Sequence, residues 1–229
     1  MGIQERKERE KNERKALILR CAKELLLEHG VERVSMIDIA KKAELSKGTL
    51  YLYFPGKEEL FREICDEAAT RFIQYFQARL KPGLSALETI KLYWLCYVDM
   101  FGESDDMIVI FNMKHYIAPA FPFSPFEDAR HPPRGPAVAA DSPYIFYTMI
   151  RDMIRQGIQE GAFDPSVNPG MIARIMLSLF SYIVENVAKM PKGEQKSQFI
   201  IAEVKHIFEI LLRGIAREGF DRSCLILPG

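Results

Sequence analysis

The sequence predicts an all-α protein, in which an N-terminal three-helix domain with a helix-turn-helix precedes a larger C-terminal helical domain. Apolar residues recur at intervals of three and four through most of the chain, which is the period of a helix with one buried face. Start and stop signals separate these helical stripes. The 229 residues, 48% of them hydrophobic, are enough to bury a sizeable core. We expect the two domains to span residues 1–56 and 57–229.

The first fifteen residues carry a dense run of charges of alternating sign. Pairs such as Glu5 with Arg9 and Glu10 with Arg14 stand four positions apart, a spacing that stabilises an exposed helix. The segment therefore either extends the first helix or frays. An apolar stripe begins at residue 16, and the first helix is expected to end at the following His-Gly pair, residues 29–30.

Residues 34–57 predict two short helices joined by a tight turn, followed by the start of a third. Ser35 is a good N-cap with an acidic residue three positions later, close to a capping box. This helix is expected to end near Glu44. Ser46 is a second N-cap, for a short helix that runs to Tyr53.

The second short helix has an unusual outer face. Leu50 and Phe54 are four positions apart and would face the core. The remaining residues lie on or beside the outer face: Lys47, Gly48, Thr49, Tyr51 and Tyr53. Lysine can reach guanine or phosphate, threonine can contact bases, tyrosine can bind phosphate, and glycine permits close backbone approach. This face suits a wide DNA groove, although the same spacing also arises by chance in small helical subdomains.

Several motif elements of this region match a known family in register. They are Ala40, then residues 45–51 (LSKGTLY), then Tyr53-Phe54, then residues 57–60 (KEEL). In these residues the chain resembles the tetracycline-repressor (TetR) family of transcriptional regulators. The close match covers about the first quarter of the chain, and beyond it only the all-helical layout agrees.

The resemblance implies a set of DNA-binding residues and a double-stranded DNA operator as partner. Phosphate contacts are implied for Ser46, Tyr51, Tyr53 and Lys57. Base-edge contacts are implied for Lys47, Gly48 and Thr49. Support at the start of the preceding helix is implied for Ser35 and Met36. The charged segment 3–15 is then either a solvated face or an arm that reaches an adjacent groove.

The overall charge excludes a strongly basic nucleic-acid coat. The chain has 31 basic and 31 acidic residues, so its formal net charge is zero. Residues 1–60 hold 13 Lys and Arg against 11 Asp and Glu. Any affinity for DNA must therefore come from where charges are placed rather than from their sum.

The remaining composition predicts a cytoplasmic protein with no cofactor, metal site or membrane partner. The four cysteines are far apart, without metal-ligand spacing, and are expected to be reduced and mostly buried. The charged N-terminus does not resemble a signal peptide. The longest apolar runs, such as 175–184, are too short to span a bilayer.

The middle of the chain begins with a long helix, predicted from Lys57 to Leu80, whose start lies near DNA and whose end packs in the C-terminal domain. A change in the angle of this helix would therefore couple the two domains. Further helices are expected after Ser85, after Ser104 and from Tyr144. Residues 118–143 contain seven of the 13 prolines and cannot be helical throughout. They form either a lid over a cavity or a surface loop.

The last two long helices carry more apolar surface than one subunit needs. The first begins at Asn168-Pro169, a cap followed by proline. We expect a homodimer through the helices 169–190 and 194–218, which form the dimerisation element in the family that the chain resembles. A twofold dimer also places two recognition helices on half-sites about 34–36 Å apart.

Aromatic and methionine side chains line the central helices. Each alone is typical of core packing, but together they suit a cavity for a small apolar or amphipathic effector, which the resemblance places between these helices. Asp99, His115 and Glu185 lie on or near these stripes and could orient a ligand, although each alone is more typical of partial exposure or of an internal ion pair. The expected effector-binding residues are Trp94, Tyr97, Asp99, Phe111, His115, Tyr147 and Phe180.

The resulting functional hypothesis is a ligand-responsive repressor that binds a palindromic operator as a homodimer. An effector that favours another angle of the 57–80 helix would shift the population away from the DNA-bound arrangement. The alternative is a dimeric DNA-binding protein that responds to no ligand. An enzyme is not expected, because the four histidines show no catalytic or metal spacing and the chain has no glycine-rich phosphate loop.

Overall fold

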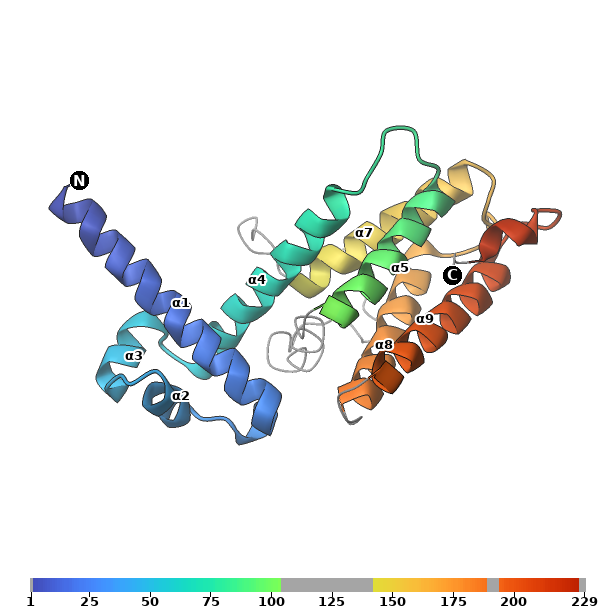
Figure 1. Cartoon of the computed structure of the whole chain (residues 1–229). Helices are drawn as coiled ribbons and strands as arrows, with labels where there is room; N and C mark the ends of the chain where they lie inside the picture. Colours follow the sequence, from blue (N-terminus) through green and yellow to red (C-terminus); the bar gives the residue numbers. More distant parts are fainter. Residues whose placement is uncertain (1, 104–141, 189–193, 227–229) are drawn as a thin grey trace.

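The computed structural model describes residues 2–103, 142–188 and 194–226, which fold into helices and short connections (Figure 1). These residues form eight α-helices: α1 (Ile3–His29), α2 (Met36–Lys42), α3 (Lys47–Tyr53), α4 (Lys57–Gln77), α5 (Ala86–Glu103), α7 (Ser142–Gln159), α8 (Pro169–Ala188) and α9 (Glu194–Ile215). Two short 3-10 helices are η1 (Val31–Arg33) and η2 (Arg222–Leu225). Extended pairing in the described residues is a single antiparallel bridge between Phe163 and Ala216. The predicted all-α class is confirmed.

The helices α1, α2 and α3 and the first turns of α4 pack around one buried cluster. Ile18, Ile39 and Leu50 are completely buried in it, and Phe54 is 3% exposed, as the helical spacing predicts. Gly30 ends α1 with a φ of 79°, which a residue without Cβ adopts at little cost. The predicted end of the first helix is therefore confirmed, and α1, α2, α3 and the start of α4 share one small core.

The helix α4 runs through both halves of the molecule, as Figure 1 shows. Its first turns belong to the N-terminal cluster, and its later turns, from Ala68 to Phe76, belong to a second, larger cluster. The helix ends at Gln77, three residues before the predicted Leu80. Leu80 is 39% exposed, so its side chain does not continue the buried stripe, and its amide donates to the carbonyls of Phe76 and Gln77.

The second cluster lies among α4, α5, α7, α8 and α9. Ser85 caps α5 together with Glu88, and the Asn168 side chain caps α8 by accepting a hydrogen bond from the amide of Met171, both as predicted. The helix expected from Tyr144 begins earlier, at Ser142. The helix expected after Ser104, and the proline-rich segment up to residue 141, lie outside the described residues.

The last helix, α9, ends at Ile215 and not at residue 218 as predicted. The backbone beyond this point is held by a distant segment. The carbonyl of Ile215 accepts a hydrogen bond from the amide of Asp164, and the amide of Arg217 donates to the carbonyl of Ala162. These bonds replace the helical ones, so a contact about fifty positions away in sequence decides where the helix stops.

Within the three described ranges, no helix has both the length and the apolar composition that crossing a lipid bilayer requires.

Candidate functional site

The turn between α2 and α3 sets the angle at which the second short helix leaves the first. α2 ends at Lys42, slightly before the predicted end near Glu44. Glu44 has a φ of 54°, in the left-handed region that side chains other than glycine rarely adopt. The amide of Leu45 donates back to the carbonyl of Ala40, which closes the turn. The next helix can therefore begin after a connection of only a few residues.

Ser46 starts α3 as the sequence predicts. Its hydroxyl accepts a hydrogen bond from the amide of Thr49, and the two hydroxyls lie 2.8 Å apart. Lys47 Nζ lies 5.8 Å from the centre of the Tyr51 ring, a cation–π distance. A cation, a hydroxyl group and a phenol ring are thus held close together on one short, capped helix.

The outer face of α3 is open to solvent. Lys47, Gly48 and Tyr51 are exposed, and Thr49 is half-buried. A Cβ built on Gly48 would meet only the Ser46 hydroxyl, at 3.9 Å, so the glycine is not required by internal packing. This space lies in front of the helix, where another molecule can approach the backbone closely.

Leu52 lies on the same outer face and was missed by the sequence analysis. It is 86% exposed, the most exposed large hydrophobic residue described. It stands four positions after Gly48, one helical turn further along the same side. That spacing was the available signal. An apolar side chain here can contact the methyl group of thymine.

The other expected DNA-binding residues are more constrained. Ser35 forms a capping box with Asp38, and its hydrogen bonds lower the pKa of that carboxyl. Met36 is buried and supports the start of α2 from the core side. Tyr53 is half-buried against the N-terminal cluster. Lys57 Nζ donates to the carbonyl of Val31 at 2.7 Å, and burial lowers the pKa of this lysine.

The comparison with known families decides what this three-helix unit is. The family model described as "Bacterial regulatory proteins, tetR family" matches residues 18–64, which include α2, α3 and the turn between them. The chain belongs to the TetR family. It is a TetR-type transcriptional regulator that binds DNA. The family consists of regulators, which agrees with the expectation that the chain is not an enzyme.

Relatives with curated names cover most of the chain. The "Uncharacterized HTH-type transcriptional regulator YhgD" of Bacillus subtilis is 25% identical over 172 residues, 75% of this chain and 83% of its own. The "Fatty acid metabolism regulator protein" of the same organism is 22% identical over 198 residues, 86% and 93% of the two chains. A solved gamma-butyrolactone receptor, an ArpA-like protein, superposes with a TM-score of 0.62 at 14% identity and covers 90% of each chain. This last likeness shows the fold.

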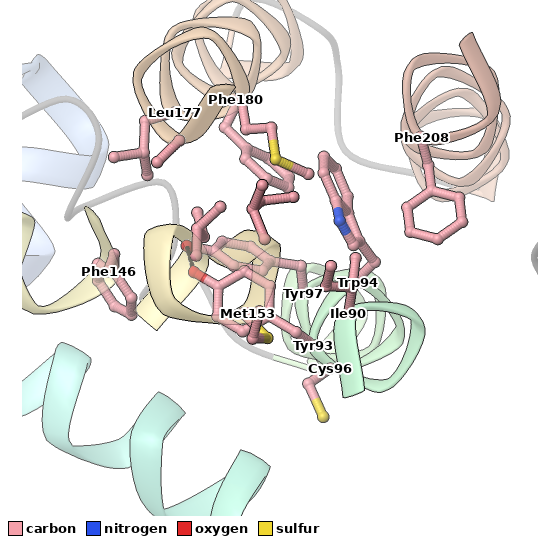
Figure 2. Packing of buried hydrophobic residues seen from close by; sticks show 14 of the residues in the cluster. Ile90, Tyr93, Trp94, Cys96, Tyr97, Phe146, Met153, Leu177, Phe180 and Phe208 are labelled. Carbon is pink, nitrogen blue, oxygen red and sulfur yellow. Dashed lines mark hydrogen bonds between the residues drawn. The ribbon is translucent and has the colours of Figure 1, made fainter. Parts of the chain in front are cut away.

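The C-terminal half of this TetR regulator contains a cluster of contacting aromatic rings (Figure 2). Phe180 on α8 stacks on both Trp94 and Tyr97 of α5, with ring centres 4.2 and 4.4 Å apart. Phe208 on α9 meets the other side of Trp94 edge-on, at 5.5 Å. Three of the expected effector-binding residues, Trp94, Tyr97 and Phe180, are therefore brought into direct contact, and a ligand among them would have to separate rings.

Three polar groups lie inside this aromatic cluster. Tyr93 donates a hydrogen bond to the hydroxyl of Tyr97, and burial raises the pKa of both tyrosines well above the ordinary value. Both hydroxyls therefore stay protonated at any physiological pH. The indole Nε1 of Trp94 is buried and has no hydrogen-bond partner within the part of the chain that the structure describes. A buried donor without an acceptor costs about 1–3 kcal/mol.

The remaining expected effector residues are not gathered in the same place. Asp99 is exposed and accepts a hydrogen bond from Tyr75 at 3.0 Å. Tyr147 is half-buried where α7 meets α8, with its hydroxyl beside Gly170. Phe111 and His115 lie outside the described residues. Phe72 of α4, which was not expected, contacts the rings of Tyr93, Tyr97 and Phe146.

Apolar side chains also remain exposed on the last two helices. Met171 and Tyr182 on α8 are 54% and 61% exposed, and Ile210 on α9 is 62% exposed. A Cβ on Gly214, four positions after Ile210, would meet no atom within 4 Å. These helices lie side by side, at the end of the molecule away from α1–α3 (Figure 1). We call this exposed set, Met171, Tyr182, Ile210 and Gly214, the α8–α9 face.

Proposed function

We propose that the regulator is a repressor that binds a palindromic operator as a homodimer and is released by a small, mainly apolar molecule. The observation that carries the DNA part is the outer face of α3. Its lysine, glycine, tyrosine and leucine stand clear of the core, inside the segment that matches the family. Such residues fit base edges and phosphates in the major groove. In this proposal residues 1–56 form the DNA-binding domain, which the first turns of α4 complete by packing against it, and residues 57–229 serve ligand binding and dimerisation.

The α8–α9 face supports the homodimer. Monomeric proteins seldom leave several large apolar residues exposed on adjacent helices, and such patches mark contacts with partners. Each subunit would contribute two helices, and the twofold axis would set the two α3 helices on half-sites about 34–36 Å apart. The interface includes the predicted helices 169–190 and 194–218 where they coincide with α8 and α9.

The aromatic cluster supports an effector with an apolar body and one hydrogen-bond acceptor. Such a molecule would replace ring contacts with its own and would accept a hydrogen bond from Trp94 Nε1, which has no acceptor among the residues that the structure describes. Because Phe72 lies on α4, parting the rings would move the helix that leads to α3. Shifting a two-state equilibrium from mostly bound to mostly released requires about 5 kcal/mol of differential binding.

Removing single groups from α3 tests the DNA contacts. Lys47→Ala and Tyr51→Phe are each expected to lower operator affinity about tenfold, because a lost base or phosphate contact costs about 1 kcal/mol or more. The operator would first be selected from random DNA by the purified protein, and affinity measured by fluorescence anisotropy. Lys81→Ala removes an exposed lysine remote from α3 and serves as the matched control.

Sedimentation velocity should show that both variants keep the mass of the dimer. Wild-type affinity in both Lys47→Ala and Tyr51→Phe would refute the contact assignment.

Replacing Trp94 with phenylalanine tests the effector site. The change keeps an aromatic ring but removes the N–H donor, so the potency of an acceptor-bearing effector should fall about tenfold. Fatty acids and their esters are the first compounds to test, because one curated relative is a fatty acid metabolism regulator. Thermal shift and operator release provide the two readouts.

A hydrocarbon analogue without a carbonyl is the control compound. The wild-type and Trp94→Phe proteins should respond to it equally. An equal response of wild type and Trp94→Phe to the acceptor-bearing compound would contradict the proposed bond. If no compound in a broad hydrophobic panel stabilises the wild-type protein, the ligand-independent dimer becomes the better account.

A further inference from the structure

The first turns of α1 project beyond both buried clusters. Side chains from Gln4 to Arg14 are all exposed, and Figure 1 shows this end of α1 extending past α2, α3 and α4. The segment is continuous with the rest of α1, so it is a helical arm rather than a frayed end. Twelve helical residues span about 18 Å. We call residues 3–14 the arm.

The charges of the arm are segregated by face. On its outer side, Arg6 pairs with Glu10 at 2.9 Å and Arg9 with Glu13 at 3.4 Å. These are the ion pairs that form, in place of the predicted Glu5–Arg9 and Glu10–Arg14 pairs. Among the residues that the structure describes, the cations of this outer face are therefore largely neutralised by their own neighbours.

The opposite side of the arm is basic. Lys7, Lys11 and Arg14 follow one another at intervals of four and three, and the same intervals continue into Ile18 and Cys21 of the buried face of α1. The three cations therefore lie on the side of α1 that faces the three-helix unit. No carboxylate within the described part of the chain lies at ion-pair distance from any of them.

The arm leaves the protein body beside the end of α3. Lys15, the residue after the arm, lies with Nζ 5.8 Å from the ring of Phe54, the C-cap of α3, and pairs with Glu63 of α4. The basic stripe is thus continuous with the edge of the recognition surface. A duplex that contacts α3 would continue alongside it.

We propose that Lys7, Lys11 and Arg14 form a second DNA-contact surface, which binds backbone phosphates of the duplex that flanks each half-site. This proposal rests on the proposed binding of α3 to the operator. Residues 4–14 contain no apolar side chain that could enter a membrane. Duplex DNA, in contrast, carries one negative charge per 1.7 Å. An arm of about 18 Å covers roughly five base pairs at 3.4 Å each, and its contacts are independent of base sequence.

A pair of charge-matched variants tests this surface. Lys7→Gln/Lys11→Gln removes two cations from the basic stripe, and Arg6→Gln/Arg9→Gln removes two cations from the outer side of the same turns. Each is measured on two operator duplexes, one trimmed to the α3 half-sites and one extended by about ten base pairs at each end. Circular dichroism verifies that helix content is equal in all proteins.

On the extended duplex, Lys7→Gln/Lys11→Gln should bind about tenfold more weakly than wild type at low salt. Its plot of log affinity against log salt should be shallower by about 0.9 per lost contact, or roughly 3–4 for the four contacts of a dimer. On the trimmed duplex, wild type and Lys7→Gln/Lys11→Gln should bind with equal affinity. The affinity of Arg6→Gln/Arg9→Gln should stay close to that of wild type on both duplexes.

Equal affinity of wild type and Lys7→Gln/Lys11→Gln on the extended duplex would overturn the proposal, as would equal losses in both double variants, which would indicate an effect of net charge alone. A different result would contradict the proposed function itself. In that case the wild-type protein would already fail to protect the trimmed operator.

Discussion

Replacing Gly48 with glutamate is expected to lower operator affinity by about 100-fold or more while leaving the fold intact. Each half-site loses base contacts worth about 1–3 kcal/mol, and the dimer carries the change twice. A carboxylate in the groove adds repulsion from the phosphates. The fold should tolerate the side chain, because only the Ser46 hydroxyl lies near a Cβ at this position, at 3.9 Å. Operator titration and thermal unfolding measure the two effects.

The alanine variant separates bulk from charge. Gly48→Ala should stabilise the protein by about 0.5–1 kcal/mol, because alanine is the better helix former, while still weakening operator binding. The two effects thus have opposite signs. Alanine binding as tightly as glycine would show that DNA does not approach the backbone at this point.

Replacing Ile210 with aspartate is expected to convert the dimer into a monomer and to reduce operator affinity by about 100-fold or more. The side chain is 62% exposed in the protomer, so its loss should not disturb the fold of one subunit. In the proposed dimer it becomes buried against the partner, where an unpaired charge is costly. A monomer then binds only one half-site and loses the gain in affinity that comes from linking two α3 helices in one dimer. Sedimentation equilibrium gives the mass.

Ile226→Asp provides the matched control. Ile226 is 48% exposed but lies after η2 and outside the α8–α9 face. It should change neither the mass nor the affinity. A dimer of unchanged stability in the Ile210→Asp protein would place the subunit interface elsewhere.

The helix-turn-helix formed by α2 and α3 could be predicted from the sequence because the contacts that determine it are local. Ser46 caps α3 through an amide three residues away, and Leu50 and Phe54 face the core by simple helical spacing. Leu52 was missed although the same arithmetic places it one turn from Gly48. An apolar side chain is by default expected in the core, and Leu52 departs from that expectation.

Other features depend on contacts that no local pattern specifies. Asp99 is held by Tyr75, which is 24 positions earlier, and Lys57 by the carbonyl of Val31, 26 positions earlier. In the arm, Glu10 stands four positions from both Arg6 and Arg14, so the spacing alone cannot choose its partner. Which cations of the arm are paired and which form the basic stripe depends on that choice.

The aromatic cluster shows a similar limit. Periodicity identified Trp94, Tyr97 and Phe180 as apolar helix positions, but their mutual stacking depends on how α5 meets α8. The contribution of Phe72 depends in turn on how α4 packs against both α5 and α7. That Trp94 Nε1 meets no acceptor in the described parts of the chain is a property of this packing and of no sequence motif.

Photo-crosslinking from position 52 tests the central claim most directly, because this residue is 86% exposed on the outer face of α3. A photoreactive amino acid placed there would be irradiated with the selected operator, and the cross-linked bases would be mapped by sequencing. We expect cross-links at two symmetry-related base positions about one helical turn apart, 34–36 Å. Cross-links confined to one position, or their absence while the protein still binds the operator, would contradict a twofold regulator that reads DNA with α3.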